Sequence, residues 1–412
     1  MAFRFLHAAD LHLDTPFEGL SRVEPELARR LVDASLEALD RLVEAALREQ
    51  VRFVVIAGDV YDGADRGIRA QLKLLDATKR LSGAGIDTFL AHGNHDPVEE
   101  GWSAVQSWPE RVQTFPSDAM RTFVLDAPGG ERVTVTGISY ARRDVSENLA
   151  LRFPPPEGEG FHVAVLHANV GQASEHAAYS PCTVDDLAGT GHHYWALGHV
   201  HKRQILREHG PCIAYPGNLQ GRSFKPSEHG PKGALLVEVA GARVTSAFLD
   251  LAPVRFDELV VDARECEDLG AVADALMASA GALETGGRRV LVRATVTGAT
   301  PAWDSLTDDG AADELLQALR DRSVGLPDLC FADLKLDVHP AVDIDSYAGR
   351  GDLLGELVDE AARVGADALT LRTLLTDHEG LRGLAADDNT DLSQVLRRAT
   401  ELAVGLLTKG ST

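Results

Sequence analysis

The chain has 412 residues, of which 44% are hydrophobic and 25% are charged, and its formal net charge is −23. This length exceeds the usual size of one hydrophobic core, so we expect two or three folded domains and exclude a disordered protein. Nucleic-acid affinity normally depends on clustered Lys and Arg, so the acidic charge argues against strong unaided binding to nucleic acid.

The first hundred residues follow a β-α-β pattern. Residues 3–6 and 51–57 are short runs of strand-forming residues, and residues 25–50 between them carry apolar side chains at helical spacing. A second helix, at about residues 68–82, leads to a strand at residues 88–91. Helices that alternate with strands predict a parallel sheet covered by helices.

The next part of the chain is a succession of strands with few helices between them. The predicted strands are residues 122–125, 132–138, 162–166, 194–197, 204–207, 213–215, 234–239 and 243–249. Together with the first hundred residues they predict an α/β (α+β) domain over residues 1–250, in which a sandwich of sheets has helices outside.

The pattern changes past residue 251. Predicted strands and helices alternate there, the strands at residues 257–261, 288–296 and 331–338 and the helices at residues 269–279 and 311–320. This predicts a small α/β domain over residues 251–345, followed by a helical segment over residues 346–412. From residue 251 onward the chain holds 15 basic and 30 acidic residues, so the first domain is closer to neutral.

The amino terminus and the cysteines bear on the location of the protein. The amino terminus turns polar at His7, and no apolar run is long enough to cross a bilayer, so we expect no export and no membrane anchor. The cysteines lie far apart without a C-x-x-C pair, which is typical of reduced thiols; they are Cys182, Cys212, Cys266 and Cys330. We therefore predict a cytoplasmic protein.

Five stretches with metal-binding side chains each follow a predicted strand. In chain order they are Asp10-x-His12, Gly58-Asp59, Gly93-Asn94-His95-Asp96, His167 and Gly198-His199-x-His201. Ligands collect at the carboxyl ends of strands in open α/β sheets. Alone, His167 would be an ordinary loop histidine, and only its place in the series makes it a candidate ligand.

The types of side chain in this series indicate the metal and the reaction. Carboxylates, imidazoles and an amide oxygen suit manganese, iron or zinc, and the lack of cysteine ligands argues against structural zinc. Two such cations about 3.5–4 Å apart can clamp the attacking and the leaving oxygen of a displacement at phosphorus. The sequence therefore predicts a two-metal phosphoesterase. Other histidines beside the motifs fit no ligand position: His7, His92, His162, His192 and His193.

The series resembles the motifs of the calcineurin-like metallophosphoesterases. Within that superfamily, residues 7–13, 58–62 and 215–222 are similar to SbcD-type DNA repair nucleases, in particular to their YhaO-like branch. The resemblance covers residues 1–250 and implies a four-layer β-sandwich flanked by helices. It also implies that residues 251–345 form a capping domain, and that residues 346–412 dock a coiled-coil ATPase of the SbcC or YhaN type.

The resemblance also implies a role for each residue of the series. Two divalent cations, most consistent with manganese, would share Asp59 as a bridge. One would be held by Asp10, His12, Asp59 and His201, and the other by Asp59, Asn94, His167 and His199. His95 would be the catalytic histidine, which contacts the scissile phosphate and protonates or stabilises the leaving oxygen, with Asp96 orienting its imidazole.

The resulting hypothesis is a manganese-dependent DNA exonuclease or endonuclease, in which hydroxide held by the metals attacks a backbone phosphate. Its partners would be DNA ends, the ATPase and a second copy of the chain. Basic residues near the motifs are candidates for binding DNA phosphates, although scattered surface cations are the alternative: Arg142, Arg143, Lys202, Arg203, Arg222 and Lys225.

Two alternatives stay open. The same site could act on a nucleotide, a cyclic nucleotide or a phosphoprotein, although Gly63 stands where protein phosphatases place an arginine. The second alternative is a non-catalytic adaptor that binds DNA ends or an ATPase, and the complete ligand series argues against it. One departure from the resemblance is Asp62, which stands where archaeal relatives carry a second histidine near the substrate.

Overall fold

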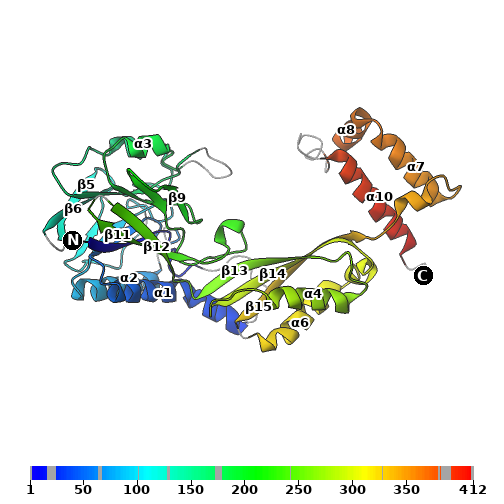
Figure 1. The fold of residues 1–412 in the computed structure, drawn as a ribbon, viewed down its shortest axis with the longest axis horizontal. Coiled ribbons are helices and arrows are strands. Elements are labelled where there is room, and N and C mark those ends of the chain that lie inside the picture. The colour runs from blue at the N-terminus through cyan, green and yellow to red at the C-terminus, as the bar shows by residue number, and fades with distance from the viewer. Residues whose placement is uncertain are drawn as a thin grey trace. The chain divides into compact units, whose positions relative to one another are not determined.

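A computed structural model describes residues 2–15, 25–63, 67–100, 102–127, 130–171, 179–241, 243–326, 328–378, 381 and 391–409. The chain divides into two compact units (Figure 1). Unit 1 comprises Met1–Asp257 and Gly286–Leu291, and unit 2 comprises Glu258–Thr285 and Val292–Thr412.

Unit 1 is built on two six-stranded sheets. The first has the order β12-β11-β1-β2-β3-β4, with the strands Arg243–Asp250, Gly233–Ala240, Ala2–Ala8, Phe53–Ala57, Asp87–Ala91 and Val112–Thr114. The second has the order β5-β6-β7-β8-β10-β9, with the strands Arg121–Ala127, Glu131–Gly137, Phe161–His167, Tyr194–Gly198, Cys212–Tyr215 and Gln204–Arg207. Each sheet has a parallel centre, β1 to β4 in the first and β6, β7, β8 and β10 in the second.

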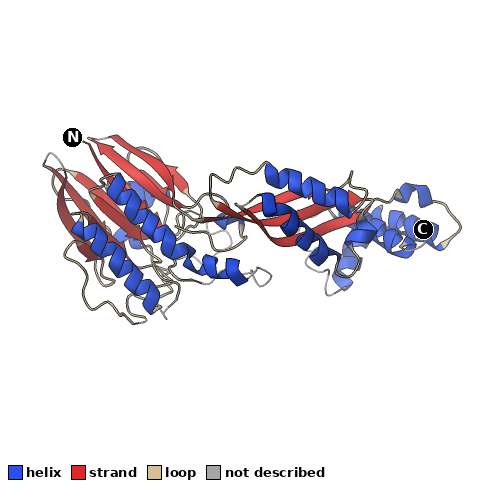
Figure 2. Ribbon diagram, turned by 90° about the horizontal axis from the view of Figure 1, so that it is seen from below, coloured by secondary structure: helices blue, strands red, loops and turns tan. Residues whose placement is uncertain are grey.

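Two buried clusters show how these sheets are layered. One joins apolar side chains of both sheets and is the core of the sandwich. The other joins the opposite face of the first sheet to α1 (Pro25–Arg48) and α2 (Ile68–Gly83), which lie side by side along it (Figure 2). The second sheet is covered on its outer face by α3 (Val184–Ala188) and a 3-10 turn at Leu149–Arg152. The predicted fold, a sandwich of sheets flanked by helices, is confirmed.

Strand β2 shows why the central strands are apolar throughout. Successive side chains of a strand point to opposite faces, and both faces of this sheet are covered. Phe53 and Val55 therefore pack between the sheets, while Val54 and Ile56 pack against the helices. The ring of Phe53 stacks on Phe5 of β1 with centroids 4.6 Å apart.

The parallel strands bring the metal-binding motifs to one place. Because β1, β2 and β3 run in the same direction, the loops that follow them leave the sheet at the same edge. The loops after β7 and β8 do so in the second sheet, where His167 pairs with Gly198. Bridges from Leu13 to Tyr61 and from Ala9 to Asn218 tie the loops together.

Unit 2 contains a three-stranded sheet and most of the remaining helices. The sheet has the order β13-β14-β15, and its strands are Val254–Asp262, Arg289–Thr300 and Leu329–Pro340, so β13 and β14 run across the boundary between the units. Helices α5 (Trp303–Leu306) and α6 (Ala311–Arg322) contact β15, and α4 (Leu269–Gly281) packs against α6. Figure 1 shows α4 and α6 beside the sheet.

The C-terminal segment is helical, as predicted. It consists of α7 (Leu353–Gly365), α8 (Ala368–Asp377) and α10 (Leu392–Thr408), which contact one another around Val358 and Val404. Residues 379, 380, 382–390 and 410–412 of this predicted helical segment lie outside the described residues. The boundaries at residues 250 and 345 stay predictions. Across the part of the chain that the structure describes, none of the helices has the length and hydropathy needed to span a membrane.

Three short elements escaped the sequence analysis. Strand β4 has three residues and α5 has four, which is too short for a periodic pattern. Helix α3 has five, and a capping box stabilises its start: the Thr183 hydroxyl accepts from Asp186 N, and the Asp186 carboxylate accepts from Thr183 N. Short elements of this kind depend on tertiary contacts.

The core between the sheets predicts a large effect of truncating one ring. Replacing Phe53, which is fully buried, with Ala should destabilise the protein by about 3–5 kcal/mol because it leaves a cavity. Val124→Ala, on the 55% exposed Val124 of β5, should change stability by less than about 0.5 kcal/mol. Urea unfolding measures both, and equal midpoints for the two variants would contradict this account of the core.

Candidate metal centre

The structure places all seven predicted ligands at the carboxyl ends of strands, six in the loops that follow and His167 as the last residue of β7. Most of them are almost inaccessible to solvent: Asp10, His12, Asp59, Asn94 and His167 are each at most 3% exposed, and His199 and His201 are partly exposed. Buried charged and polar groups need partners. The contacts within this cluster therefore show what it is built to hold.

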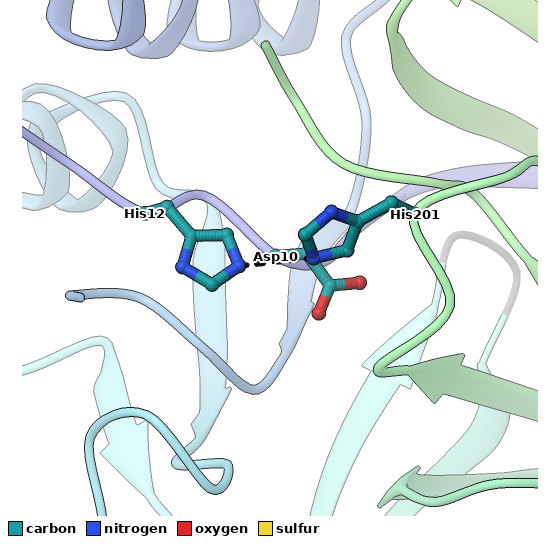
Figure 3. A group of neighbouring side chains, drawn as sticks. All are labelled: Asp10, His12 and His201. Atoms are coloured by element: carbon teal, nitrogen blue, oxygen red, sulfur yellow. Dashed lines mark hydrogen bonds between the residues drawn. The ribbon is translucent and has the colours of Figure 1, made fainter. Parts of the chain in front are cut away.

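One group of ligands forms around His12 and His201. The Nε2 atoms of the two imidazoles lie 3.1 Å apart, and the carboxylate of Asp10 is close to both (Figure 3). Ligand atoms that share one transition-metal ion at 2.0–2.2 Å lie about 3 Å from each other. The spacing therefore fits a cation held by Asp10, His12 and His201.

The second group surrounds Asn94. Its Oδ1 lies 3.0 Å from Nε2 of His167 and 3.2 Å from Nδ1 of His199. The same His167 Nε2 lies 3.4 Å from Oδ2 of Asp59. These four side chains come from the end of β7 and the loops after β2, β3 and β8, so neither sheet alone could form the group.

Asp59 faces both groups. Its Oδ2 lies 3.8 Å from His12 Nε2 and 3.4 Å from His167 Nε2, while its Oδ1 accepts a hydrogen bond from His95 N at 2.9 Å. One carboxylate oxygen thus lies between the two sets of ligands. A carboxylate in this position could bridge two cations.

Hydrogen bonds orient two of the imidazoles. His167 donates from Nδ1 to Ala57 O at 3.0 Å, and His201 donates from Nδ1 to Glu228 Oε1 at 2.6 Å. Each bond leaves the Nε2 lone pair facing the ligand cluster. The buried His12 Nδ1 has no hydrogen-bond partner among the described residues, and Asp62 Oδ1 lies 3.7 Å away.

The electrostatics of the cluster favour bound cations. Burial raises the pKa of Asp10 to about 6 and lowers the pKa of His12 to about 3. Burial also acts to raise the pKa of Asp59, but the charge and hydrogen bond of His167, together with the charges of His12 and His95, outweigh it and hold that pKa well below its usual range. An ionised, buried carboxylate needs nearby positive charge, which divalent cations supply.

The backbone is strained at four of the predicted metal ligands. Asp10, His12, Asp59 and His199 have φ values of 51°, 41°, 50° and 101°, which is the left-handed region that non-glycine residues seldom adopt. Such conformations persist only where the surrounding structure enforces them. Here they direct the ligand side chains into the cluster.

Two glycines of the motifs are required by close packing. A Cβ on Gly93 would overlap Asp59 Oδ1 and lie 2.8 Å from His167 Nε2. A Cβ on Gly198 would overlap Ala57 O. The loops can approach the ligands only because these positions carry no side chain.

The imidazole of His95 is held by Asp62. His95 Nδ1 lies 2.5 Å from Asp62 Oδ1. Burial acts to lower the pKa of His95, but its hydrogen bond to the Asp62 carboxylate and the charges of Asp59 and Asp62 together outweigh it, so the pKa is raised. A protonated imidazole beside the metal ligands is suited to give a proton to a leaving group.

Asp96, to which the sequence analysis gave the orienting role, contacts different groups. Its Oδ1 accepts from Gly93 N at 2.8 Å, and its Oδ2 accepts from Val60 N at 3.1 Å and lies 2.9 Å from His92 Nδ1. Asp96 therefore joins the loops after β2 and β3, and the carboxylate beside His95 is Asp62. An orienting role of Asp96 toward His95 stays a prediction.

Glu228 is a functional candidate that the sequence analysis missed. It is 4% exposed, and besides His201 it accepts hydrogen bonds from Asn218 Nδ2 at 2.7 Å and Arg222 N at 3.1 Å. Burial acts to raise the pKa of Glu228, but the hydrogen bond and charge of His201, together with the charge of Lys232 and the hydrogen bond from Asn218, outweigh it and lower the pKa to about 2. Lys232 completes the network by donating to His201 O at 2.8 Å.

The basic residues proposed to bind DNA are in different settings. Arg142 lies 3.6 Å from Glu99, and the guanidinium of Arg203 lies over the ring of Phe248 at 4.1 Å. Arg222 donates from Nη1 to Asp62 Oδ2 at 2.9 Å and so joins the site itself. His7, which fits no ligand position, lies in the core against Tyr194 and Leu197.

The two sheets and the paired ligand groups define a metallophosphoesterase of the two-metal kind. The chain belongs to the calcineurin-like phosphoesterase family, whose sequence pattern matches residues 3–203. Residues 256–339 match a second pattern, the middle domain of metallophosphoesterase YhaO. The family uses two divalent metal ions, and by membership the chain is a phosphoester hydrolase.

Similar proteins support this assignment. The uncharacterized metallophosphoesterase YhaO of Bacillus subtilis is 35% identical over 77% of this chain and 77% of its own length. The DNA double-strand break repair protein Mre11 of Aeropyrum pernix is 27% identical over 58% of each chain. A subunit of the nuclease SbcCD from Staphylococcus saprophyticus is 24% identical over 62% of this chain and 71% of that protein.

The packing at Gly93 predicts that one methyl group disrupts the site. Gly93→Ala should abolish tight metal binding, because the Cβ displaces Asp59 and His167. Gly83→Ala is the matched control: it ends α2, meets nothing within 4 Å, and should leave metal binding unchanged. Isothermal titration with Mn²⁺ measures both. Native affinity in Gly93→Ala would contradict the proposed ligand set.

The hydrogen bond between Glu228 and His201 predicts a role in metal affinity. Glu228→Gln keeps the shape of the side chain but removes the charge that orients the imidazole, and should weaken metal binding about tenfold to a hundredfold. Glu208→Gln, on an exposed side chain, should bind metal like the native protein. If the Glu228 variant has native affinity, the contact supports the loop and not the metal.

Proposed function

We propose that the chain is a manganese-dependent nuclease that hydrolyses phosphodiester bonds of the DNA backbone. The observation that carries this proposal is the position of Asp59 between two ligand groups, with His95 donating its backbone N–H to the same carboxylate. The names of two relatives, a double-strand break repair protein and a nuclease subunit, support DNA as the substrate. The nitrogen and oxygen ligands support manganese.

The residues would divide the reaction as follows. Asp10, His12, Asp59 and His201 hold one cation, and Asp59, Asn94, His167 and His199 hold the other. When bound, the two cations supply a nucleophile from water and neutralise the charge of the phosphate. His95 gives a proton to the departing sugar oxygen, and Asp62 positions His95 for that transfer.

The rest of the chain would serve the substrate or a partner. We propose that residues 251–345 form the capping domain and that residues 346–412 dock a coiled-coil ATPase of the SbcC or YhaN type. Leucines on the helices of this segment are exposed, among them Leu353, Leu369, Leu402 and Leu406. One relative is named as a subunit of a nuclease, which supports a partner. A partner with basic surfaces would also offset the net charge of −23.

The proposal is tested by comparing two substrates with different leaving groups. The native protein in Mn²⁺ should cut end-labelled linear DNA and hydrolyse bis(4-nitrophenyl) phosphate, and Asp59→Asn should do neither. His95→Ala should lose about 10²–10⁴-fold on DNA. Its loss on the nitrophenyl ester should be much smaller, because nitrophenolate leaves without a proton. His209→Ala, on an exposed imidazole, is the control.

Two outcomes would count against the proposal in different ways. An equal loss on both substrates in His95→Ala would remove His95 from the proton transfer. Turnover of the nitrophenyl ester without any DNA cleavage would keep the metal site but favour a nucleotide, cyclic nucleotide or phosphoprotein substrate, or a requirement for the ATPase.

A further inference from the structure

Arg222 lies at the site although it is not one of the predicted metal ligands. Its Nη1 donates to Asp62 Oδ2 at 2.9 Å, and Asp62 Oδ1 lies 2.5 Å from His95 Nδ1. The Asp62 carboxylate therefore stands between the guanidinium and the imidazole. The loop of Asp59 to Gly63 offers no cation of its own within the described residues, so the guanidinium comes from a distant part of the chain.

The guanidinium has donors to spare. Arginine carries five N–H donors, and among the described residues the side chain makes a single hydrogen bond, that to Asp62. Its Nε is buried and without a partner in the described part of the chain. The side chain is 21% exposed, so it is open to solvent on one side. A buried donor left unsatisfied costs stability, and this cost is typical of a group that awaits a ligand.

The backbone of Arg222 is tied to the metal ligands. Its N–H donates to Glu228 Oε2 at 3.1 Å, and the other oxygen of Glu228 accepts from His201 Nδ1. One buried carboxylate thus sets the position of both the arginine and a metal ligand. Such a link keeps the guanidinium at a constant place relative to the cations, as preorganised binding requires.

We propose that Arg222 binds a second phosphate, the neighbour of the one that is cleaved. The Asp62 carboxylate lies between the guanidinium and the His95 imidazole, so an anion on the remaining guanidinium donors is a different phosphate from the one that His95 contacts. Guanidinium groups bind phosphates through paired, charge-assisted hydrogen bonds. The site therefore distinguishes a nucleic-acid strand, which carries successive phosphates, from a substrate with one. This inference rests on the proposed function.

The test compares nucleotides that carry one or two phosphates. Calorimetry on the full chain in Mn²⁺ gives the Kd of thymidine 3′,5′-bisphosphate and of thymidine 3′- and 5′-monophosphate. The native protein should bind the bisphosphate about tenfold or more tightly than either monophosphate. Arg222→Ala should bring this ratio close to one. Arg222→Gln, which keeps a donor for Asp62 but no charge, should do the same if the alanine variant fails to fold.

The matched control is Arg48→Ala. Arg48 is an exposed, ion-paired arginine at the end of α1, at the opposite edge of the first sheet from the metal loops, and its loss changes the net charge equally. This variant should keep the native ratio. An equal weakening of all three nucleotides in the Arg222 variants would overturn the proposal, because the arginine would then touch the scissile phosphate. The proposal would also be overturned if the native protein showed no preference for the bisphosphate, or if the Arg222 variants kept the native preference.

The proposed function is tested by a separate measurement, the hydrolysis of phosphodiesters in Mn²⁺. If the native chain hydrolyses no phosphodiester in Mn²⁺, the nuclease proposal is wrong whatever the ratio. If it hydrolyses bis(4-nitrophenyl) phosphate and shows no preference for the bisphosphate, the role of Arg222 alone is wrong.

Discussion

The buried carboxylate of Asp59 is the group on which the site depends. It lies between His12 and His167, which are placed by strands of different sheets, and it also accepts a hydrogen bond from the backbone N–H of His95. A charge placed there is stable only with cations beside it. The strained backbone of the ligand loops and the glycines that let them approach are consequences of bringing so many polar groups to one carboxylate.

The sandwich provides the rigidity that this arrangement needs. Phe5 and Phe53 stack between the sheets below the site, and the parallel strands carry the loops to one edge. Contacts around the site then orient individual imidazoles. Ala57 O and Glu228 accept hydrogen bonds from His167 and His201, and Asp62 contacts Nδ1 of His95. Precise ligand placement follows from these contacts, because a metal site tolerates little error in geometry.

Much of the fold and the ligand set could be predicted from the sequence. The long strands and helices have a clear period, and the residues that follow them are of metal-binding types, so Asp10, Asp59 and His199 stand out by pattern. Helix α3 and strand β4 could not be predicted, because elements of three to five residues have too little local signal. Glu228 was missed because it lies 27 residues from His201, in a 3-10 turn of three residues that has no periodic signal.

The sequence by itself determined the class of chemistry, since side-chain types and their place after strands are local properties. The tertiary structure decided which groups act together. In the folded chain His95 contacts Asp62, and Asp96 accepts hydrogen bonds from the loops after β2 and β3. Arg222 and Glu228 lie beside the metal ligands. The reason is physical: a hydrogen bond depends on distances of about 3 Å in space, and chain separation does not specify such distances between irregular loops.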